Sequence, residues 1–441
     1  MKLTVWSRCA AVILAVSLTV LAGCGKPAGD AAQPSQETTP EVQQGPVELT
    51  LWTYYENGWQ STIDAFRREH PNIDIKVTSY PFAEYAQKYL SALADGTGPD
   101  IMLVDSAHLG DFGAIEGVEN LLSPPYDAGR YKADFSPSMW DSMMSLDGKR
   151  LISLPLDTAP SVTYYRADLL KAYGFPDEPE ALGKFMENPD NWLAIGEELQ
   201  KHGSYIVQWE SDLIHLHEAS MPFFDRSLNL MRNNDTMVRA LDIAKTVNQK
   251  GLDANVDIWT EVGEKAVKSG KIAMLYLGTW GADQIQAWAP EQEGKWRATR
   301  LPFGLYGFEN SSSFILPSEG KHKKEAWQFV EHTATVASKK GEGGGTHAYL
   351  PSRGNANVMA QTNPYMGGQH TNALYESLAG QMKERMVTPL DTKAQEIWTD
   401  GILSGIEANT DSKTILEGIE KEIGKKLGRD KEILLQWQKN Q

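Results

Sequence analysis

The fold is decided by VELTLWTYYENGWQSTIDAFRREHPNIDIKV (residues 47–77) and by GTGPDIMLVDSAHLGDF (residues 96–112). Apolar and polar residues alternate at both ends of the first segment, as they do in strands that bury one face. Trp59, Ile63 and Phe66 recur at helical spacing between these ends, and a second helical pattern separates the two segments. The run IMLV in the second segment is typical of a strand covered on both faces. This β-α-β-α-β order predicts a parallel, doubly wound sheet.

The rest of the chain continues the same patterns. Helices are predicted over residues 236–250, 261–269 and 323–333, and buried strands over residues 271–277 and 313–316. The last fifty residues carry apolar stripes at helical spacing. Because a chain of 441 residues exceeds what one ordinary core holds, we expect two lobes.

The amino-terminal leader predicts export. Two basic residues accompany an apolar run over residues 10–21 that is too short to span a bilayer. The leader ends in LAGC, which resembles the lipobox of bacterial lipoproteins. The resemblance implies a signal peptide over residues 1–23 and a lipid on Cys24, which would hold the protein on the extracytoplasmic face of the cell membrane. A plain secretory signal with an incidental Cys is the alternative.

Composition narrows the class of function. The formal charge of −16 does not suit nucleic acid, whose phosphates need clustered Lys and Arg. The two cysteines are Cys9 and Cys24, so a cleaved body would hold no disulfide and no Cys-ligated zinc. Residues 24–46 lack aromatic residues and are rich in Pro, Gly and Gln, which predicts a disordered tether.

The strand tips select candidate ligand-binding residues. In open α/β sheets, ligands bind beyond the carboxyl ends of the strands, where the strand order reverses. The first strand ends at Trp52 and Tyr54, the third at Asp105, and a later strand at Gly278 and Trp280. With the strand order 2-1-3, the first two tips would adjoin. Aromatic rings beside a carboxylate suit a sugar, whose apolar face packs on rings and whose hydroxyls donate to charged acceptors. The alternatives are a helix N-cap for Asp105 and core packing for the tryptophans.

The ordered motifs resemble family 1 extracellular solute-binding proteins, the maltodextrin-binding-like receptors of ABC importers. Besides the two segments quoted first, the matching pieces are LPLDTAPSVTYYRADLLKAYG (154–174), SGKIAMLYLGTWGADQI (269–285), SFILPSEGKHKKEAWQFVEHTAT (313–335) and YLPSRGNA (349–356). The resemblance implies an α/β, two-lobed, type II periplasmic-binding-protein-like fold, each lobe a doubly wound sheet joined by hinge crossovers. The implied lobes are residues 47–157 with 278–312 (N-lobe) and residues 158–277 with 313–441 (C-lobe).

The resemblance also implies a function and its residues. The chain would capture a sugar or short oligosaccharide by lobe closure and deliver it to ABC permease subunits. It would act as a monomer held at the membrane by its lipid, without enzyme activity, cofactor, metal or nucleic acid. The ligand-contacting segments of the family fall on Trp52 and Glu56, Asp105, Asp157, Trp209 and Glu210, Gly278 and Trp280, and Arg353.

Several alternatives stay open at this point. A surface glycoside hydrolase or lyase needs a carboxylate pair, for which Asp105 and Asp157 qualify in principle. A sensor subunit, or a receptor for glycerophosphodiesters or polyamines, would show the same fold. His215 and His217 suggest a metal site, although histidines at this spacing are more often ordinary polar groups. Paired tyrosines suggest binding of ferric iron, although the simpler interpretation is that the two rings of a pair lie on opposite faces of a sheet.

Overall fold

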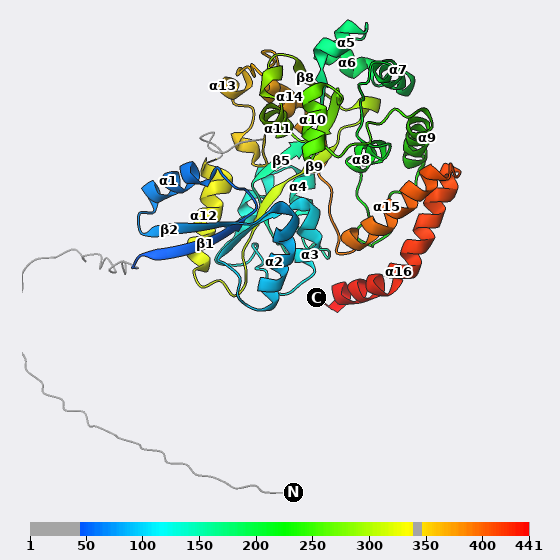
Figure 1. Cartoon of the computed structure of the whole chain (residues 1–441). Coiled ribbons are helices and arrows are strands. Elements are labelled where there is room, and N and C mark those ends of the chain that lie inside the picture. The colour runs from blue at the N-terminus through cyan, green and yellow to red at the C-terminus, as the bar shows by residue number, and fades with distance from the viewer. Residues whose placement is uncertain (1–44, 338–345, 441) are drawn as a thin grey trace, which may run out of the picture. The chain divides into compact units, whose positions relative to one another are not determined.

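The computed structural model describes residues 45–337 and 346–440 (Figure 1). The leader, Cys24 and nearly all of the expected tether lie outside these residues. Within the two described ranges, the helices lack the combination of length and apolar content that a membrane span requires.

A five-stranded sheet in the order β2-β1-β3-β10-β4 forms the centre of the first lobe. Its strands are β1 (Val47–Thr53), β2 (Ile73–Ser79), β3 (Ile101–Asp105), β4 (Leu154–Pro155) and β10 (Ser312–Ile315). β1 lies parallel to both β2 and β3, which confirms the parallel sheet predicted for this segment and gives the order 2-1-3 in which the tips of β1 and β3 adjoin. β10 runs antiparallel to β3, with Ser312 opposite Asp105. The carboxyl ends of β1 and β3 therefore meet the beginning of β10 at one edge.

Helices cover both faces of this sheet because each presents an apolar stripe. They are α1 (Trp59–Glu69), α2 (Phe82–Ala94), α3 (Leu109–Gly113), α4 (Pro137–Ser142) and α12 (Lys323–Glu331). α1 and α12 share one face, where Phe66 packs edge-on against Phe329. α2 covers the other face, where Tyr89 packs against Trp52. The two-sided cover explains why β3 is apolar without interruption.

The second lobe is built on a three-stranded sheet in the order β7-β6-β8. Its strands are β6 (Val162–Arg166), β7 (Met274–Leu277) and β8 (Trp296–Thr299). β6 runs antiparallel to both neighbours, whereas β1, β2 and β3 of the first lobe are parallel. An apolar strand indicates that both faces are covered, but it does not reveal the direction of its partners.

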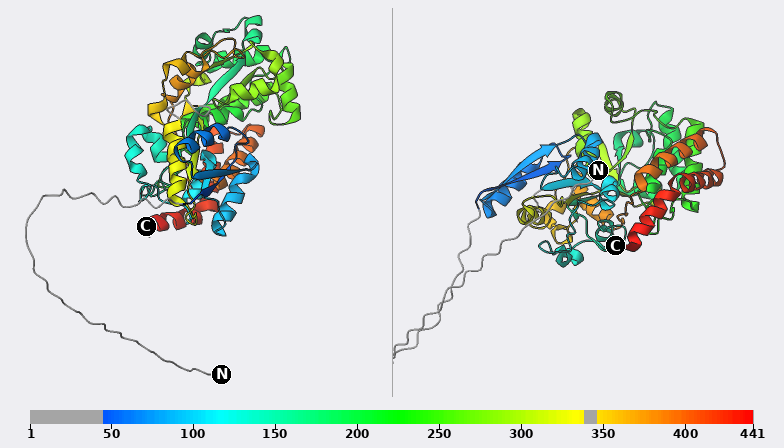
Figure 2. Two further views of the ribbon diagram at one scale, coloured as in Figure 1. Left: turned by 90° about the vertical axis from the view of Figure 1, so that its left-hand side faces the viewer. Right: turned by 90° about the horizontal axis from the view of Figure 1, so that it is seen from below.

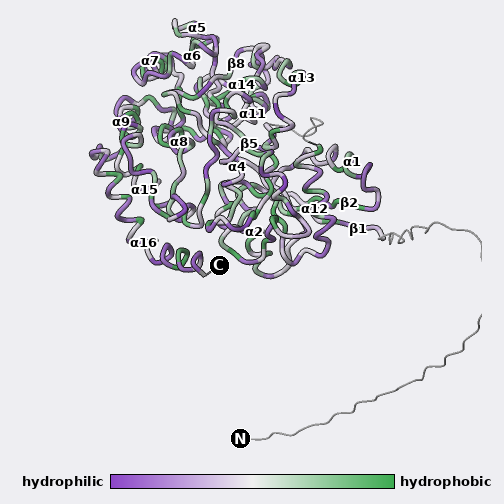
Figure 3. The backbone as a smooth tube through the Cα atoms, turned by 180° about the vertical axis from the view of Figure 1, so that it is seen from behind, coloured by the Kyte–Doolittle hydropathy of each residue, from purple (hydrophilic) through white to green (hydrophobic). Residues whose placement is uncertain are grey.

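The helices of the second lobe surround two apolar cores. They are α5 (Ala167–Ala172), α6 (Pro179–Phe185), α7 (Pro189–Gln200), α8 (Asp212–Glu218), α9 (Asp235–Lys250), α10 (Glu261–Ser269), α11 (Gly281–Trp288), α13 (Ala356–Met359), α14 (Thr371–Ala379), α15 (Asp391–Glu407) and α16 (Ser412–Asn440). α15 and α16 lie side by side (Figure 2). Hydrophobic positions recur along α16 (Figure 3), and the predicted stripe Leu416, Ile419, Ile423 and Leu427 is buried.

A small sheet in the order β11-β5-β9 connects the two lobes. β5 (Asp157–Pro160) leads from β4 to β6, and β9 (Phe308–Asn310) leads back to β10, while β11 (Thr346–His347) pairs with β5. A further passage lies between α14 and α15, where Glu384 accepts a hydrogen bond from the hydroxyl of Ser136 in the first lobe at 2.9 Å. These passages are the crossovers that a hinged fold requires.

The sheet pairing places two segments differently from the expected lobe boundaries. The lobe boundaries expected from the sequence place residues 278–312 in the N-lobe and residues 313–441 in the C-lobe. In the structure β8 pairs with β6, and α11 belongs to the second-lobe core. β10 and α12 belong instead to the core of the first lobe. The chain returns to the first lobe at β9 and not at β7, a difference that hydropathy alone does not reveal because both lobes use apolar strands.

Candidate functional site

A polar cluster lies at the edge where β1 and β3 end and β10 begins. The hydroxyls of Tyr54 and Ser312 are 2.7 Å apart. The hydroxyl of Tyr55 donates to Oδ2 of Asp157 at 2.8 Å and also contacts the Ser312 hydroxyl. The backbone N–H of Ser312 donates to Oδ1 of Asp157 at 2.8 Å. We call Tyr54, Tyr55, Asp105, Asp157 and Ser312 the edge cluster.

Asp105 occupies the end of β3 and is 1% exposed. Its Oδ1 accepts the backbone N–H of Ala107 at 2.8 Å, so it caps the short 3₁₀ turn that follows, as the alternative interpretation predicted. Its Oδ2 accepts the side-chain amide of Asn310 at 2.9 Å, which ties the first sheet to β9. Burial raises the pKa of this carboxyl, and the two donors oppose the rise.

The small connecting sheet contributes a third carboxylate to the same region. Glu309 lies on β9 and accepts a hydrogen bond from the hydroxyl of Ser161 at 2.8 Å. Burial raises its pKa, and the charges of Arg385 and His215 partly compensate. The charge of Asp105 raises the pKa of both Asp157 and Glu309, so the three carboxylates lie within electrostatic reach of one another. The sequence did not single out Glu309, Asn310 or Ser312.

The pH dependence of stability should report the burial of Asp157. Burial raises its pKa to about 6 from the 3.8 that is ordinary for an aspartate. The folded protein therefore binds the proton more tightly than the unfolded chain does. This contribution to stability is complete below pH 3.8 and is lost as the pH rises through about 6. Urea unfolding of Asp157→Asn and of the wild type across pH 4–7 should show a smaller decline with rising pH for the variant.

Tyr55→Phe provides a second test of the raised pKa of Asp157, with a shift expected in the pH dependence of stability. It removes a donor that lowers the pKa of Asp157, so the decline should move to higher pH than in the wild type. Unfolding profiles of Asp157→Asn and the wild type that stay parallel over the whole range would contradict the assignment.

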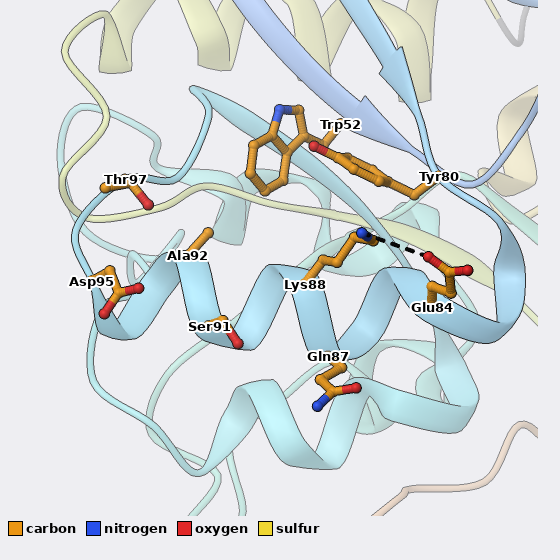
Figure 4. Close-up of a pocket in the computed structure, with 9 residues that line it drawn as sticks. All are labelled: Trp52, Tyr80, Glu84, Gln87, Lys88, Ser91, Ala92, Asp95 and Thr97. Carbon is orange, nitrogen blue, oxygen red and sulfur yellow. Dashed lines mark ion pairs between the residues drawn. The ribbon is translucent and has the colours of Figure 1, made fainter.

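Trp52 lies outside the edge cluster. Its ring packs against Tyr80 (centroids 5.1 Å apart) and Tyr89 (5.6 Å) on the face of the sheet that α2 covers. It lines a surface pocket of about 580 Å³ beside α2 (Figure 4). The other lining residues are Tyr80, Glu84, Gln87, Lys88, Ser91, Ala92, Asp95 and Thr97. Trp52 lies within β1 on the face opposite Leu51, whereas Tyr54 lies just beyond the end of the strand, where it reaches the edge cluster.

Two further predicted residues, Glu56 and Arg353, also lie outside the edge cluster. Glu56 is exposed and has no hydrogen bond to another described residue. Arg353 forms an ion pair with Glu376 of α14, with Nε 3.1 and 3.0 Å from the two carboxylate oxygens. Within the described ranges, Trp52, Glu56 and Arg353 make neither a hydrogen bond nor a ring contact with the edge cluster. Their role in binding stays a prediction.

The second lobe presents the remaining predicted residues on neighbouring loops. Gly278 follows β7, and a Cβ there would lie 2.4 Å from Nε1 of Trp280, so the glycine lets the indole lie against the backbone. The half-buried Trp280 ring contacts Trp259 at 5.8 Å. Trp209 is 36% exposed, and Glu210 beside it is half-buried. The loops that carry these residues supply aromatic surface and a carboxylate to the second lobe.

The histidine and tyrosine pairs have ordinary structural partners. Nδ1 of His215 lies 3.2 Å from Oε2 of Glu218, and Nδ1 of His217 lies 2.7 Å from the carbonyl oxygen of Leu213. The hydroxyls of Tyr164 and Tyr165 donate to the carbonyl oxygens of different loops. Among residues 45–337 and 346–440, no group of three or more His, Cys, Asp or Glu side chains could hold a metal ion.

The two lobes, the connecting strands and the polar edge cluster define a binding protein of the type II class. The chain belongs to the bacterial extracellular solute-binding protein family, whose model matches residues 52–340. It is 23% identical over 350 residues to the arabinooligosaccharide-binding protein of Bacillus subtilis, with 75% of each chain covered. It is 27% identical over 332 residues to the galactooligosaccharide-binding protein of the same organism, covering 71% of this chain and 70% of the relative.

A solved structure shares the fold. The galacto-N-biose/lacto-N-biose I-binding protein of an ABC transporter from Bifidobacterium longum, solved with lacto-N-biose, superposes with a TM-score of 0.71. The two chains are 16% identical, and the match covers 88% of this chain and 98% of the other. The likeness confirms the predicted two-lobed, type II fold.

Proposed function

We propose that this protein is an extracellular receptor that captures a sugar or oligosaccharide by lobe closure and delivers it to an ABC permease. Family membership and the named specificities of the two Bacillus relatives support the class of ligand. The observation that carries the proposal is the edge cluster at the carboxyl ends of β1 and β3, the position where open α/β sheets bind ligands.

The chemistry of the site supports a ligand rich in hydroxyl groups. Two partly buried carboxylates, Asp157 and Glu309, offer strong acceptors, and the hydroxyls of Tyr54 and Tyr55 can donate or accept. Indole rings on the second lobe can cover the apolar face of a sugar. A ligand that contacts both lobes favours the closed state by its differential affinity, so hinge closure is the expected mechanism.

Titration calorimetry against a sugar panel tests the proposal. The panel contains arabinose and galactose with their di- and trisaccharides, and a charged non-sugar, spermidine, as control. We expect at least one sugar to bind with a Kd near micromolar, about −8 kcal/mol, and no binding of spermidine. Binding of spermidine without any sugar would reject the sugar assignment and favour a polyamine receptor.

A surface carbohydrate-active enzyme is the second candidate, because a buried acid with a pKa near 6 could act as a general acid. Against it, both oxygens of Asp157 accept hydrogen bonds from the protein itself, and the matched relatives are named as binding proteins. Incubation with the labelled trisaccharides separates the candidates, because appearance of shorter sugars would identify an enzyme.

The proposal includes attachment to the extracytoplasmic face of the cell membrane through a lipid on Cys24. The LAGC motif at the end of the leader supports it, and a body bearing a net negative charge would not attract anionic lipid by itself. Cys24→Ala is expected to release the protein from the membrane fraction without a change in sugar affinity.

A further inference from the structure

We propose that Trp259 adds a second ring-stacking position beside Trp280, so that the ligand is an oligosaccharide of at least two sugar units and not a monosaccharide. The inference rests on the proposed function and specifies the ligand's length. Trp259 was not among the residues that the sequence pointed to, because it precedes a helix and does not follow a strand.

Trp259 is the most exposed tryptophan among the large apolar side chains at the described surface. Its side chain is 59% exposed, whereas Trp280 is half-buried and Trp288 is 8% exposed. A single exposed apolar residue is common in soluble proteins. Here, however, the exposed indole continues an aromatic surface: its centroid lies 5.8 Å from that of Trp280 and 5.2 Å from that of Trp288. An exposed indole that continues the half-buried ring of Trp280 offers apolar surface to which another molecule can bind.

The loop that carries Trp259 is held in place by hydrogen bonds. The backbone N–H groups of Asn255 and Ile258 donate to the backbone and side-chain oxygens of Gln208, at 2.9 and 3.0 Å. The backbone N–H of Trp259 donates to Oδ1 of Asp257 at 2.9 Å, and Thr260 caps α10. Trp288 supports the indole edge-on from α11, which packs beside α10 (Figure 1). A side chain fixed in this way loses little entropy when a ligand covers it.

The geometry of the two indoles favours a ligand with more than one ring. Their planes are inclined by 43°, so they present two separate faces and do not stack on each other. One sugar ring can lie flat on one of these faces at a time, and a second face is used only when a second ring follows. Gln208 also connects this pair to the neighbouring Trp209, which is 36% exposed. The aromatic surface therefore extends beyond the size of a monosaccharide.

Calorimetry of Trp259→Ala with galactose, galactobiose and galactotriose, and with arabinose, arabinobiose and arabinotriose, tests the inference. In the series that the wild type binds, affinity should rise from the mono- to the trisaccharide. The variant should bind the trisaccharide with an affinity lower by about tenfold or more, because truncation of an anchoring aromatic side chain has an effect of this size. Its affinity for the monosaccharide should change by less than about twofold. Trp259→Tyr should restore part of the affinity. Ile433→Ala, which removes an apolar side chain 53% exposed on α16, is the matched control and should bind like the wild type.

The outcomes separate this inference from the proposed function. If the wild type binds sugars and Trp259→Ala binds every length with unchanged affinity, the second position is rejected while the receptor assignment stands. Equal losses for mono- and trisaccharides would also reject it, because Trp259 would then act on the first position. If the wild type binds no sugar of either series, both the inference and the assignment to these sugars fail. If the variant unfolds thermally at the same temperature as the wild type, misfolding is excluded as the cause of a loss of affinity.

Discussion

Glu218→Ala is expected to lower the free energy of unfolding by about 3 kcal/mol or more, the range found when one partner of a buried ion pair is removed. Glu218 on α8 lies 3.4 Å from Arg232, and the side chains are 8% and 5% exposed. Its Oε1 also accepts the indole N–H of Trp398 at 2.5 Å. Without the carboxylate, the Arg232 guanidinium would stay buried among apolar rings without its anionic partner. Urea unfolding at pH 7 measures the loss.

The pH dependence of this contribution has a definite sign. Burial by itself would raise the pKa of Glu218, but Arg232, His215 and Trp398 together lower it to about 2 from the 4.5 that is ordinary for a glutamate. The stabilisation is therefore present above pH 4.5 and is lost as the pH falls toward 2. Glu261→Ala is the control. Glu261 forms an ion pair with Lys265, and the two side chains are 82% and 71% exposed, so the pair should contribute about 0.5 kcal/mol or less. Equal losses in the two variants would contradict the buried network.

Trp280→Ala is expected to weaken sugar binding by about thirtyfold or more, equivalent to about 2 kcal/mol, while the protein stays folded. The half-buried ring follows β7 and lies beside Trp259, so its removal would take away the central part of the aromatic surface. Gly278→Ala tests the same point without removing the indole, because the new Cβ would displace the Trp280 ring. Calorimetry with the best-bound trisaccharide measures both effects.

Trp437→Ala supplies the matched control for this substitution. Trp437 lies on α16, where its ring faces the guanidinium of Arg150. The variant should bind sugar like the wild type. If Trp280→Ala also keeps the wild-type affinity, the second lobe does not hold the ligand through this loop.

The first lobe was largely predictable because each of its signals is local. Alternation over β1 and β2, helical spacing on α1, and the turn before β3 all lie within 60 residues of one another, and together they predict a parallel β-α-β-α-β unit. The direction of β8 and the return of the chain at β9 were not predictable. Both depend on pairing between strands far apart in the sequence, and hydropathy does not reveal which strand pairs with which.

The candidate site shows the same division. Tyr54 and Asp105 were predicted from the rule that ligands bind at strand tips, and Asp157 from the resemblance to the family; the structure brings all three into one region. Trp52 was expected in the same crevice, but it is the last residue but one of β1 and faces α2. Ser312 and Asn310 were missed, because they belong to strands that enter the sheet from the other lobe. The run of three serines before Phe314 was the one available signal, since polar residues at the beginning of an otherwise apolar strand are uncommon in a core.

The central claim is that the edge cluster and the tryptophans of the second lobe hold one and the same ligand. A crystal structure of the protein with the trisaccharide that binds most tightly tests it directly. We predict density for the sugar against Tyr54, Asp157 and Trp280, with its hydroxyls on the carboxylates. Sugar bound in the α2 pocket beside Trp52, with the edge cluster unchanged and free of ligand, would contradict the account.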